Sequence, residues 1–388
     1  MLRDVSIIGI GSTPFTVQKD RSFKELAIDA CNQAILDAGI DRKMIQSFYL
    51  GNYLSGLLIN QETIAPLVAY ELGLNIGTPA TKTEGACTSG GIALRQAYLL
   101  IAAGIYDFAL VAGAEKMSTA SREKVTMSLA AAMDPETEGA TGLTFPGFFA
   151  IIARRHMHDY GTTIEQLAQV SVKNHLNSLP NPRARFRHPT SLEEVLNSRP
   201  IADPLKLFDC CPITDGAAAA ILCPADRALE FTSKPIDIAG SGHAIGPVGI
   251  FRHQNITELW STVLAGKQAY EQAKLKPEDI DIAEIHDCFT IAEIADSEEL
   301  GFFPKGKGGF AVEEGLTQVD GKIPINPSGG LLAKGHPVGA TGAGQVYEVV
   351  KQLRDEHENQ VKDPEFGLVH NSGGSDSVCT VHILKRRS

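Results

Sequence analysis

Length, composition and charge limit what this chain of 388 residues can be. With 43% hydrophobic residues it can bury a large core in two to three domains, or in two halves with an insertion. The net charge of −11 argues against a broad nucleic-acid-binding surface, and the longest apolar runs, such as 217–223, are too short to span a membrane. The N-terminus has no signal-peptide pattern, so we expect a cytoplasmic globular protein.

The seven cysteines are odd in number and widely scattered, apart from the adjacent Cys210 and Cys211. This is not the pattern of a disulfide framework, and no CxxC motif or Cys/His spacing suggests zinc. We therefore expect free thiols in a reducing compartment and no metal site.

The first 113 residues alternate predicted strands and helices, which is typical of a sheet covered on both faces. A helix is predicted after Ser22, because Ser22 and Glu25 fit a capping box and Gly39 fits the C-cap. Further strands and helices are expected at 5–11, 48–51, 64–72, 80–83 and 108–113.

Cys87 lies in the run Glu84–Gly91, just before the predicted helix 92–100. The first N–H groups of a helix have no internal partner, and together with the helix dipole they favour a reactive thiolate. The alternative is a small buried core residue, as most cysteines in apolar surroundings are.

Between about 117 and 207 the alternation gives way to segments rich in methionine, proline and arginine, with only scattered helical stretches such as 163–176. We predict an inserted lobe at 118–207, one half formed by 1–117 plus 208–235, and a second half at 236–388. The lobe holds a dense basic cluster, Arg183, Arg185 and Arg187, which is either a phosphate-binding site or a solvated loop.

The second half repeats the opening of the chain, with a strand at 236–240 and a helix at 256–272. The segment 339–350 has the same layout as 85–91 and its helix, with Thr341 at the place of Cys87. This repeat predicts a duplicated α/β unit whose two glycine-rich helix starts meet at a central seam.

Three more stretches carry candidate reactive groups. The strand from 282 ends in His286, Asp287 and Cys288 before the predicted helix 290–300, and ligands gather at such carboxyl ends of strands. His336 lies in a loop bounded by glycine and proline, where an imidazole can activate a thiol. The turn 371–374 offers backbone N–H groups for an oxyanion.

Together these motifs resemble the thiolase superfamily over the whole chain. In that family the nucleophilic cysteine lies in a motif like 85–90, and a histidine lies in the motif Gly-His-Pro-x-Gly-Ala-Thr-Gly, found here at 335–342. The variant His-Asp-Cys-Phe at 286–289 is similar to that of sterol-carrier-protein thiolases and archaeal acetoacetyl-CoA thiolases. The usual terminal Cys-x-Gly is replaced by Asn371-Ser372-Gly373-Gly374, so the resemblance moves the acid/base cysteine to Cys288.

The resemblance implies an α/β thiolase fold: two duplicated βαβαβαββ halves in five layers, α-β-α-β-α, with an inserted loop domain. It also implies coenzyme A thioesters as substrates without a further cofactor, and a homodimer or homotetramer. By the same resemblance, a complex with an HMG-CoA synthase and a small zinc-ribbon/OB-fold protein is possible.

The implied reaction condenses two acetyl-CoA to acetoacetyl-CoA, or cleaves a 3-ketoacyl-CoA in reverse. Cys87 would be the nucleophile, His336 its base, Cys288 the base at carbon, and His336 and His286 the donors to the enolate. Substrate contacts would come from Gly373, Asn371 and the three arginines. Two alternatives stay open: a condensing enzyme of the ketosynthase type, and a non-catalytic scaffold of thiolase-like fold.

Overall fold

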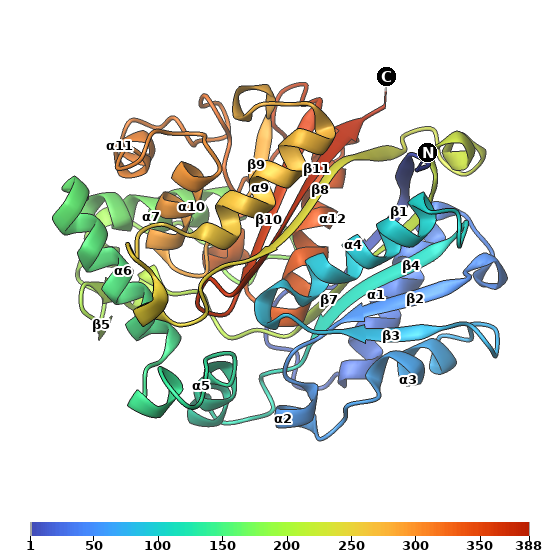
Figure 1. Cartoon of the computed structure of the whole chain (residues 1–388), viewed down its shortest axis with the longest axis horizontal. Helices are drawn as coiled ribbons and strands as arrows, with labels where there is room; N and C mark the ends of the chain where they lie inside the picture. Colours follow the sequence, from blue (N-terminus) through green and yellow to red (C-terminus); the bar gives the residue numbers. More distant parts are fainter. Residues whose placement is uncertain (1, 388) are drawn as a thin grey trace.

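The computed structural model describes residues 2–387, which fold around a mixed sheet of nine strands (Figure 1). The strand order is β3-β2-β4-β7-β1-β8-β11-β10-β9. The sheet strands are β1 (Val5–Ser12), β2 (Ser47–Gly51), β3 (Ala80–Thr83), β4 (Ala109–Glu115), β7 (Gly216–Pro224), β8 (Ile236–Ile245), β9 (Ile282–Glu284), β10 (Phe366–Gly373) and β11 (Val378–Arg386). The central strands β1 and β8 pair only at Ser6 with Asp237 and Ile7 with Ile236, so two half-sheets join at a narrow corner.

The two half-sheets have the same strand order. The first runs β3-β2-β4-β7-β1, and the second runs β9-β10-β11-β8, with Ile325 bridged in parallel to Ala283 of β9. This bridge occupies the place that β3 has beside β2. The repeat agrees with the predicted duplication, while the domain limits 1–117 plus 208–235, 118–207 and 236–388 stay a prediction.

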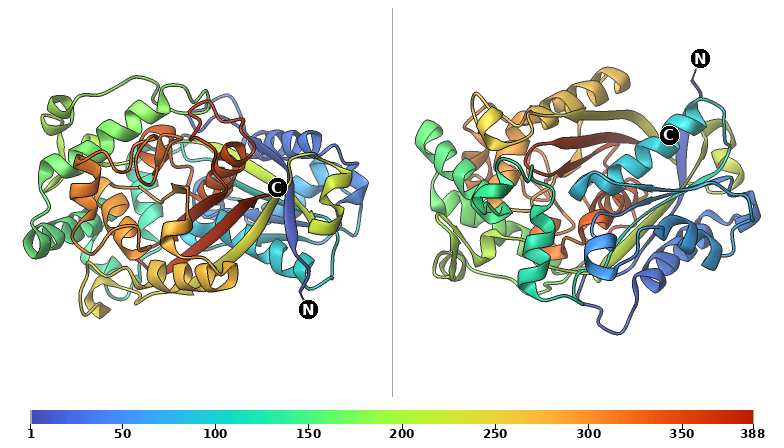
Figure 2. Two further views of the ribbon diagram at one scale, coloured as in Figure 1. Left: turned by 90° about the horizontal axis from the view of Figure 1, so that it is seen from above. Right: turned by 60° about the horizontal axis from the view of Figure 1, so that its bottom comes forward.

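Helices form three layers around and between the half-sheets (Figures 1 and 2). The outer layers are α1 (Phe23–Ala38) with α3 (Ile64–Glu71) on the first half-sheet, and α9 (Trp260–Ala273) on the second. Between them lie α4 (Ser89–Ala102) and α12 (Thr341–Leu353), each in contact with strands of both halves. The resulting order of layers is α-β-α-β-α.

Local sequence signals explain where several elements begin and end. Helix α1 has the expected capping box of Ser22 and Glu25, and it ends at Gly39, whose φ of 65° is left-handed. Helix α12 is buried along nearly its whole length, because its small and β-branched residues pack between the sheets. Helix α9 begins at Trp260, four residues later than the expected 256. No helix within 2–387 is long and apolar enough to cross a membrane.

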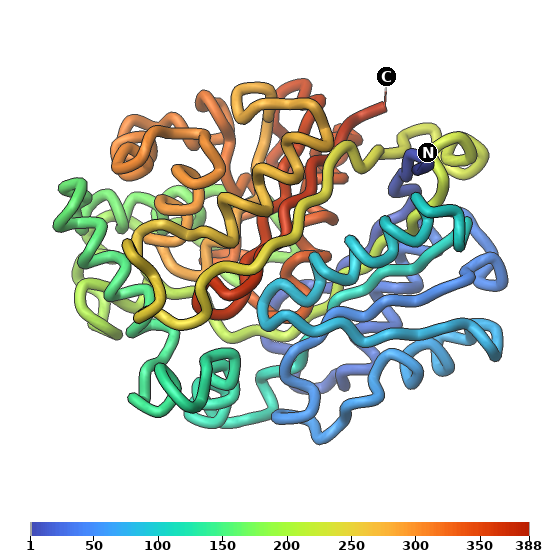
Figure 3. Tube along the Cα trace, viewed as in Figure 1, coloured from blue at the N-terminus to red at the C-terminus, as the bar shows by residue number. Residues whose placement is uncertain are grey.

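The lobe, drawn in green at one end of the molecule, contains more helix than expected (Figures 2 and 3). Helix α6 (Phe145–Tyr160) is missing from the sequence prediction because Pro146 and Gly147 resemble a break. Proline is tolerated in the first turn of a helix, where the N–H has no partner to lose. The remaining helices and strands are α2 (Ser55–Ile59), α5 (Arg122–Ala130), α7 (Ile164–Ser178), α8 (Leu192–Leu196), α10 (Thr290–Glu299), α11 (Gly308–Glu313), β5 (Pro200–Ala202) and β6 (Leu205–Lys206).

Helices α4 and α12 begin against one another. Each follows a 3₁₀ turn, at Ala86–Thr88 and Val338–Ala340 respectively. These turns make Ser89 the counterpart of Thr341, so the sequence alignment of Thr341 with Cys87 is wrong by two residues. A Cβ on Gly90 would lie 2.9 Å from the backbone N of Ala343, so only glycine permits this approach.

We predict that Gly342→Ala destabilises the fold at this seam. The added Cβ would collide with the backbone N of Gly91, and such overpacking costs about 1–3 kcal/mol in the free energy of unfolding. Gly147→Ala in α6 is the matched control, because its Cβ would meet only side-chain atoms of the preceding turn. Thermal unfolding measures both variants, and equal melting temperatures would contradict the prediction.

Candidate active site

Three predicted residues from distant parts of the chain meet at the seam. Cys87 is half-buried in the 3₁₀ turn before α4, while the buried His286 follows β9 and the buried His336 precedes α12. One ligand atom from each, a sulfur and two imidazole nitrogens, lie within 4.8 Å of one another. The two imidazole rings are edge to face, with centroids 4.9 Å apart.

The hydrogen bonds of His336 define which of its nitrogens carries the proton. Its Nδ1 lies 2.7 Å from the hydroxyl oxygen of Thr341, which also lies 3.2 Å from the carbonyl oxygen of Pro337. A carbonyl only accepts, so the hydroxyl donates to Pro337 and accepts from Nδ1–H. The proton on Nδ1 leaves Nε2 of His336 with its lone pair free to act as a base.

Burial keeps all three groups neutral. It raises the pKa of the Cys87 thiol to about 12, assisted by the nearby Glu115 carboxylate and opposed by the backbone N–H groups of Cys87 and Gly374. Burial also lowers the pKa of His336 to about 3 and holds the pKa of His286 well below its usual value. The helix start therefore does not by itself produce the thiolate that its dipole suggested, and a base is needed.

Glu115 is a buried residue of the site that sequence reasoning missed. It ends β4, and its carboxylate accepts hydrogen bonds from Asn52 Nδ2 at 2.8 Å, Tyr53 N at 3.0 Å and Gly339 N at 3.1 Å. Burial raises its pKa to about 7. An acidic residue at the end of a wholly apolar strand was the signal that could have identified it.

Cys288 is buried and is not one of the three grouped residues. It lies in an apolar cluster of lobe and second-half residues that includes Phe149 and Phe289, whose rings stack at 4.7 Å. Its carbonyl accepts from Cys211 N at 3.1 Å, and burial, with smaller contributions from the Cys211 and Cys87 thiols, holds its pKa well above the usual value.

Asp287, the second residue of the same motif, supports the loop of His336. Its buried carboxylate accepts from Leu331 N at 2.6 Å and from Asn174 Nδ2 at 2.7 Å. Leu331 belongs to the π-helical turn Gly330–Lys334 that leads directly to His336. Asp287 therefore joins the two histidine-bearing segments through the backbone.

The turn after β10 passes directly over the Cys87 turn. A Cβ on Gly373 would collide with the carbonyl oxygen of Gly85 and lie 3.1 Å from Thr88 N, so glycine is required by the approach. The backbone N–H of the next residue, Gly374, lies close enough to the Cys87 sulfur to lower the pKa of the thiol. Asn371 is buried, and its Nδ2 lies 3.1 Å from both the Cys87 carbonyl oxygen and His286 Nδ1.

The structure divides the arginine cluster into two parts. Arg183 is half-buried, lies 4.6 Å from the ring centroid of Tyr347 and donates to the Ser12 carbonyl at 3.2 Å. Through these contacts Arg183 helps the inserted lobe to pack against both halves of the fold. Arg185 and Arg187 are exposed, so they are the members of the cluster that can meet a ligand from solvent.

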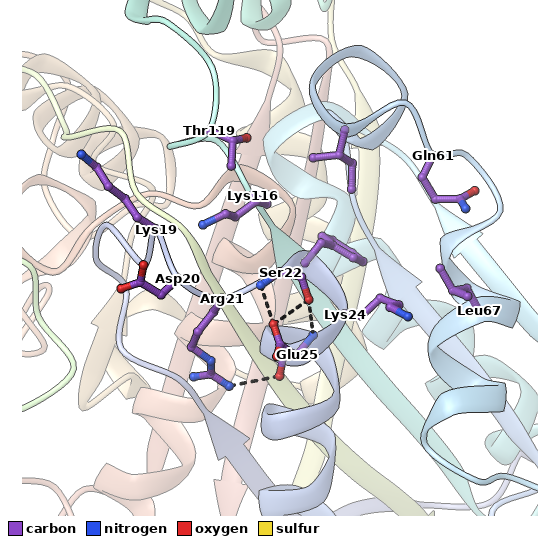
Figure 4. A pocket seen from close by; sticks show the side chains of 12 residues that line it. Lys19, Asp20, Arg21, Ser22, Lys24, Glu25, Gln61, Leu67, Lys116 and Thr119 are labelled. Carbon is purple, nitrogen blue, oxygen red and sulfur yellow. Dashed lines mark hydrogen bonds between the residues drawn. The ribbon is translucent and has the colours of Figure 1, made fainter.

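A surface cavity of about 570 Å³ lies at the start of α1 (Figure 4). Several basic side chains line it, among them Lys19, Lys24 and Lys116. The capping groups Ser22 and Glu25 bond each other there, and none of the predicted catalytic residues lines it. We therefore take the Cys87 cluster, and not this cavity, as the candidate active site.

Comparison with known proteins identifies the family. The model of the thiolase N-terminal domain matches residues 5–226, and that of the thiolase C-terminal domain matches 242–386. The chain belongs to the thiolase family. It is 48% identical to an acetyl-CoA acetyltransferase of Methanothermobacter thermautotrophicus, over 99% of this chain and 100% of that one.

Two further similar proteins agree with this assignment. Sterol carrier protein 2 of Oryctolagus cuniculus is 34% identical over 98% of this chain and 72% of its own length. The structure of an Ltp2-ChsH2(DUF35) aldolase is 28% identical and superposes with a TM-score of 0.86, covering 99% of this chain and 98% of that one. The predicted thiolase fold and the predicted branch of the family are confirmed.

We predict that Glu115→Gln makes the Cys87 thiol more reactive in the free protein. Removal of the carboxylate lowers the pKa of the Cys87 thiol. A thiol pKa that is lower by one gives about ten times more thiolate at pH 8. The measurement is the rate of Cys87 alkylation by iodoacetamide, followed by peptide mass spectrometry.

The control for this prediction is Glu84→Gln, because Glu84 is exposed and contributes less to the thiol pKa. The effect of Glu115→Gln should shrink at pH 6, where the native carboxyl is itself largely protonated. An alkylation rate unchanged at pH 8 would show that Glu115 does not influence the sulfur.

Proposed function

We propose that this thiolase is an acetyl-CoA acetyltransferase that condenses two acetyl-CoA to acetoacetyl-CoA, or runs the reverse cleavage of a 3-ketoacyl-CoA. The observation that carries the proposal is the meeting of Cys87, His286 and His336 within 4.8 Å. The full-length similarity to an acetyl-CoA acetyltransferase supports the same reaction.

The first half-reaction transfers an acetyl group to Cys87. Nε2 of His336 takes the thiol proton, and the sulfur attacks the thioester carbon. The backbone N–H groups of Cys87, Gly373 and Gly374 stabilise the tetrahedral oxyanion, and those of Cys87 and Gly374 lie close enough to the sulfur to lower the pKa of its thiol. The coenzyme A sulfur leaves with the proton from His336, and the acetyl group stays on Cys87.

The second half-reaction forms the carbon–carbon bond. Cys288 passes its thiol proton to Nε2 of His336, and the resulting thiolate removes a proton from the methyl group of a second acetyl-CoA. The raised pKa of Cys288 makes that thiolate a stronger base. His286 and the protonated His336 offer N–H groups to the enolate oxygen. The carbanion attacks the acetyl carbon, and the Cys87 sulfur leaves with the proton from His336 as acetoacetyl-CoA forms. These steps need no group beyond the coenzyme A thioesters.

Assembly and location belong to the same proposal. The strand β3, just before Cys87, is an edge of the sheet, and pairing of this edge with a second copy would give the expected homodimer or tetramer. The similarity to an Ltp2-ChsH2(DUF35) aldolase supports a complex with a partner protein. The proposed partners are an HMG-CoA synthase and a small zinc-ribbon/OB-fold protein. Seven free cysteines suit the reducing cytoplasm.

The experiment that tests the function measures acetoacetyl-CoA formation from acetyl-CoA and coenzyme A release from acetoacetyl-CoA. Activity in both directions supports a thiolase. Condensation only from a malonyl thioester would indicate a ketosynthase-type enzyme, and no turnover of any thioester would indicate a scaffold.

We predict that Cys288→Ala separates the half-reactions. Acetylation of Cys87 depends on His336 and should persist, whereas condensation should fall by about 100-fold or more because the base is lost. Exchange of methyl hydrogens with deuterated water should fall equally. The control is Cys223→Ala, a buried cysteine of β7 outside the site. Near-normal condensation by Cys288→Ala would assign the base to another residue, with His336 and His370 the next candidates.

We predict that Arg185→Gln combined with Arg187→Gln raises the KM for acetyl-CoA. The two exposed guanidinium groups are proposed to meet the phosphates of coenzyme A. The KM for an acetyl-pantetheine, which lacks those phosphates, should stay the same. The matched control replaces Arg154 and Arg155, two exposed arginines of α6. An equal rise for both substrates would contradict a phosphate contact.

A further inference from the structure

The side-chain amide of Asn371 has one chemically consistent orientation. The same amide atom lies 3.1 Å from the Cys87 carbonyl oxygen and 3.1 Å from His286 Nδ1. A carbonyl oxygen accepts and never donates, so the atom facing it is the NH₂ group. The opposite orientation would place the amide oxygen against the carbonyl oxygen of Cys87, two acceptors in contact.

This orientation determines the tautomer of His286. The NH₂ group donates to Nδ1, which must therefore carry a lone pair. The imidazole is neutral, because burial and the neighbouring His336 and His370 hold its pKa low. Its proton is consequently on Nε2. The main chain at His286 is held by its backbone N–H, which donates to His370 Nδ1 at 3.2 Å.

His286 and His336 thus have opposite tautomers side by side. Thr341 accepts from Nδ1–H of His336 and leaves an acceptor at its Nε2, while Asn371 donates to Nδ1 of His286 and leaves a donor at its Nε2. We propose that Asn371 is a positioning residue that selects the Nε2–H tautomer of His286. Resting on the proposed function, this makes His286 a ready N–H donor for the enolate oxygen.

The same selection opposes metal binding by the cluster. A thiol and two imidazoles within 4.8 Å have the composition of a zinc site, but a metal binds an imidazole nitrogen through its lone pair. Metal at His286 Nε2 would move the proton to Nδ1, where it would point at the NH₂ donor of Asn371. Asn371 therefore favours an acid–base and donor site over a cation site.

The test changes the side chain at position 371 from a hydrogen-bond donor to an acceptor toward His286 Nδ1. In Asn371→Asp the carboxylate accepts from Nδ1–H and moves the lone pair of His286 to Nε2, whereas Asn371→Ala removes the selection without reversing it. At pH 8.5, the condensation rate of the Asp variant should be about 100-fold below that of the native protein, which is the typical loss for one oxyanion donor. The rate of the Ala variant should fall less. A purely structural role predicts the opposite order, because Asp has nearly the shape of Asn.

Zinc binding provides a readout that does not depend on turnover. Calorimetry with Zn²⁺ alone should give one site per chain in Asn371→Asp, at least about tenfold tighter than in the native protein. The site should disappear when Cys87→Ser is added to Asn371→Asp. Equal zinc affinity in the native and Asp proteins, or higher condensation by the Asp than by the Ala variant, would overturn the proposal.

Nitrogen NMR of the native protein decides the tautomer even if a variant fails to fold. With ¹⁵N-labelled histidine, and the His286 signals assigned by their loss in His286→Gln, Nδ1 should show the shift of an unprotonated nitrogen. A protonated Nδ1 would refute the role of Asn371. If the native protein shows no condensation, the proposed function fails, while the NMR and zinc results still decide the tautomer.

Discussion

The site depends on the close approach of two helix starts. Helices α4 and α12 come from equivalent places in the two halves, and they touch through Gly90 and Gly342, where no side chain fits. The turn before α4 carries Cys87, and the loop before α12 carries His336. Because packed cores are not easily deformed, this contact fixes the distance between sulfur and imidazole at the seam.

Burial then sets the chemistry of the groups that the seam brings together. A thiol with a raised pKa and imidazoles with lowered pKa values form a neutral site, which suits an uncharged thioester carbonyl. Acyl transfer begins when the His336 lone pair accepts the Cys87 proton and leaves a charged sulfur. Fixed N–H groups near the sulfur are then already oriented toward the developing oxyanion, and they need no rearrangement.

Much of this arrangement could be predicted from the sequence, because local signals specify it. The capping box of α1, the glycine-rich helix starts and the reactive residues after buried strands all follow from residue order. The register of the repeat could not be predicted, because the correspondence of Thr341 with Ser89 follows from the two 3₁₀ turns, which the sequence does not reveal. The contact of Asn371 with His286 also depends on tertiary approach, and the proline at 146 concealed α6. Glu115 had a local signal, its place at the end of an apolar strand, but its contact with the backbone of Gly339 depends on tertiary approach.

The central claim is that Cys87 carries the acyl group between two coenzyme A thioesters. Mass spectrometry of the protein mixed with acetyl-CoA tests it most directly, at the level of the intact chain and of its peptides. The account predicts one acetyl group per chain on the peptide with Cys87, removable by free coenzyme A. An unmodified Cys87, or an acetyl group on Cys288 instead, would contradict it.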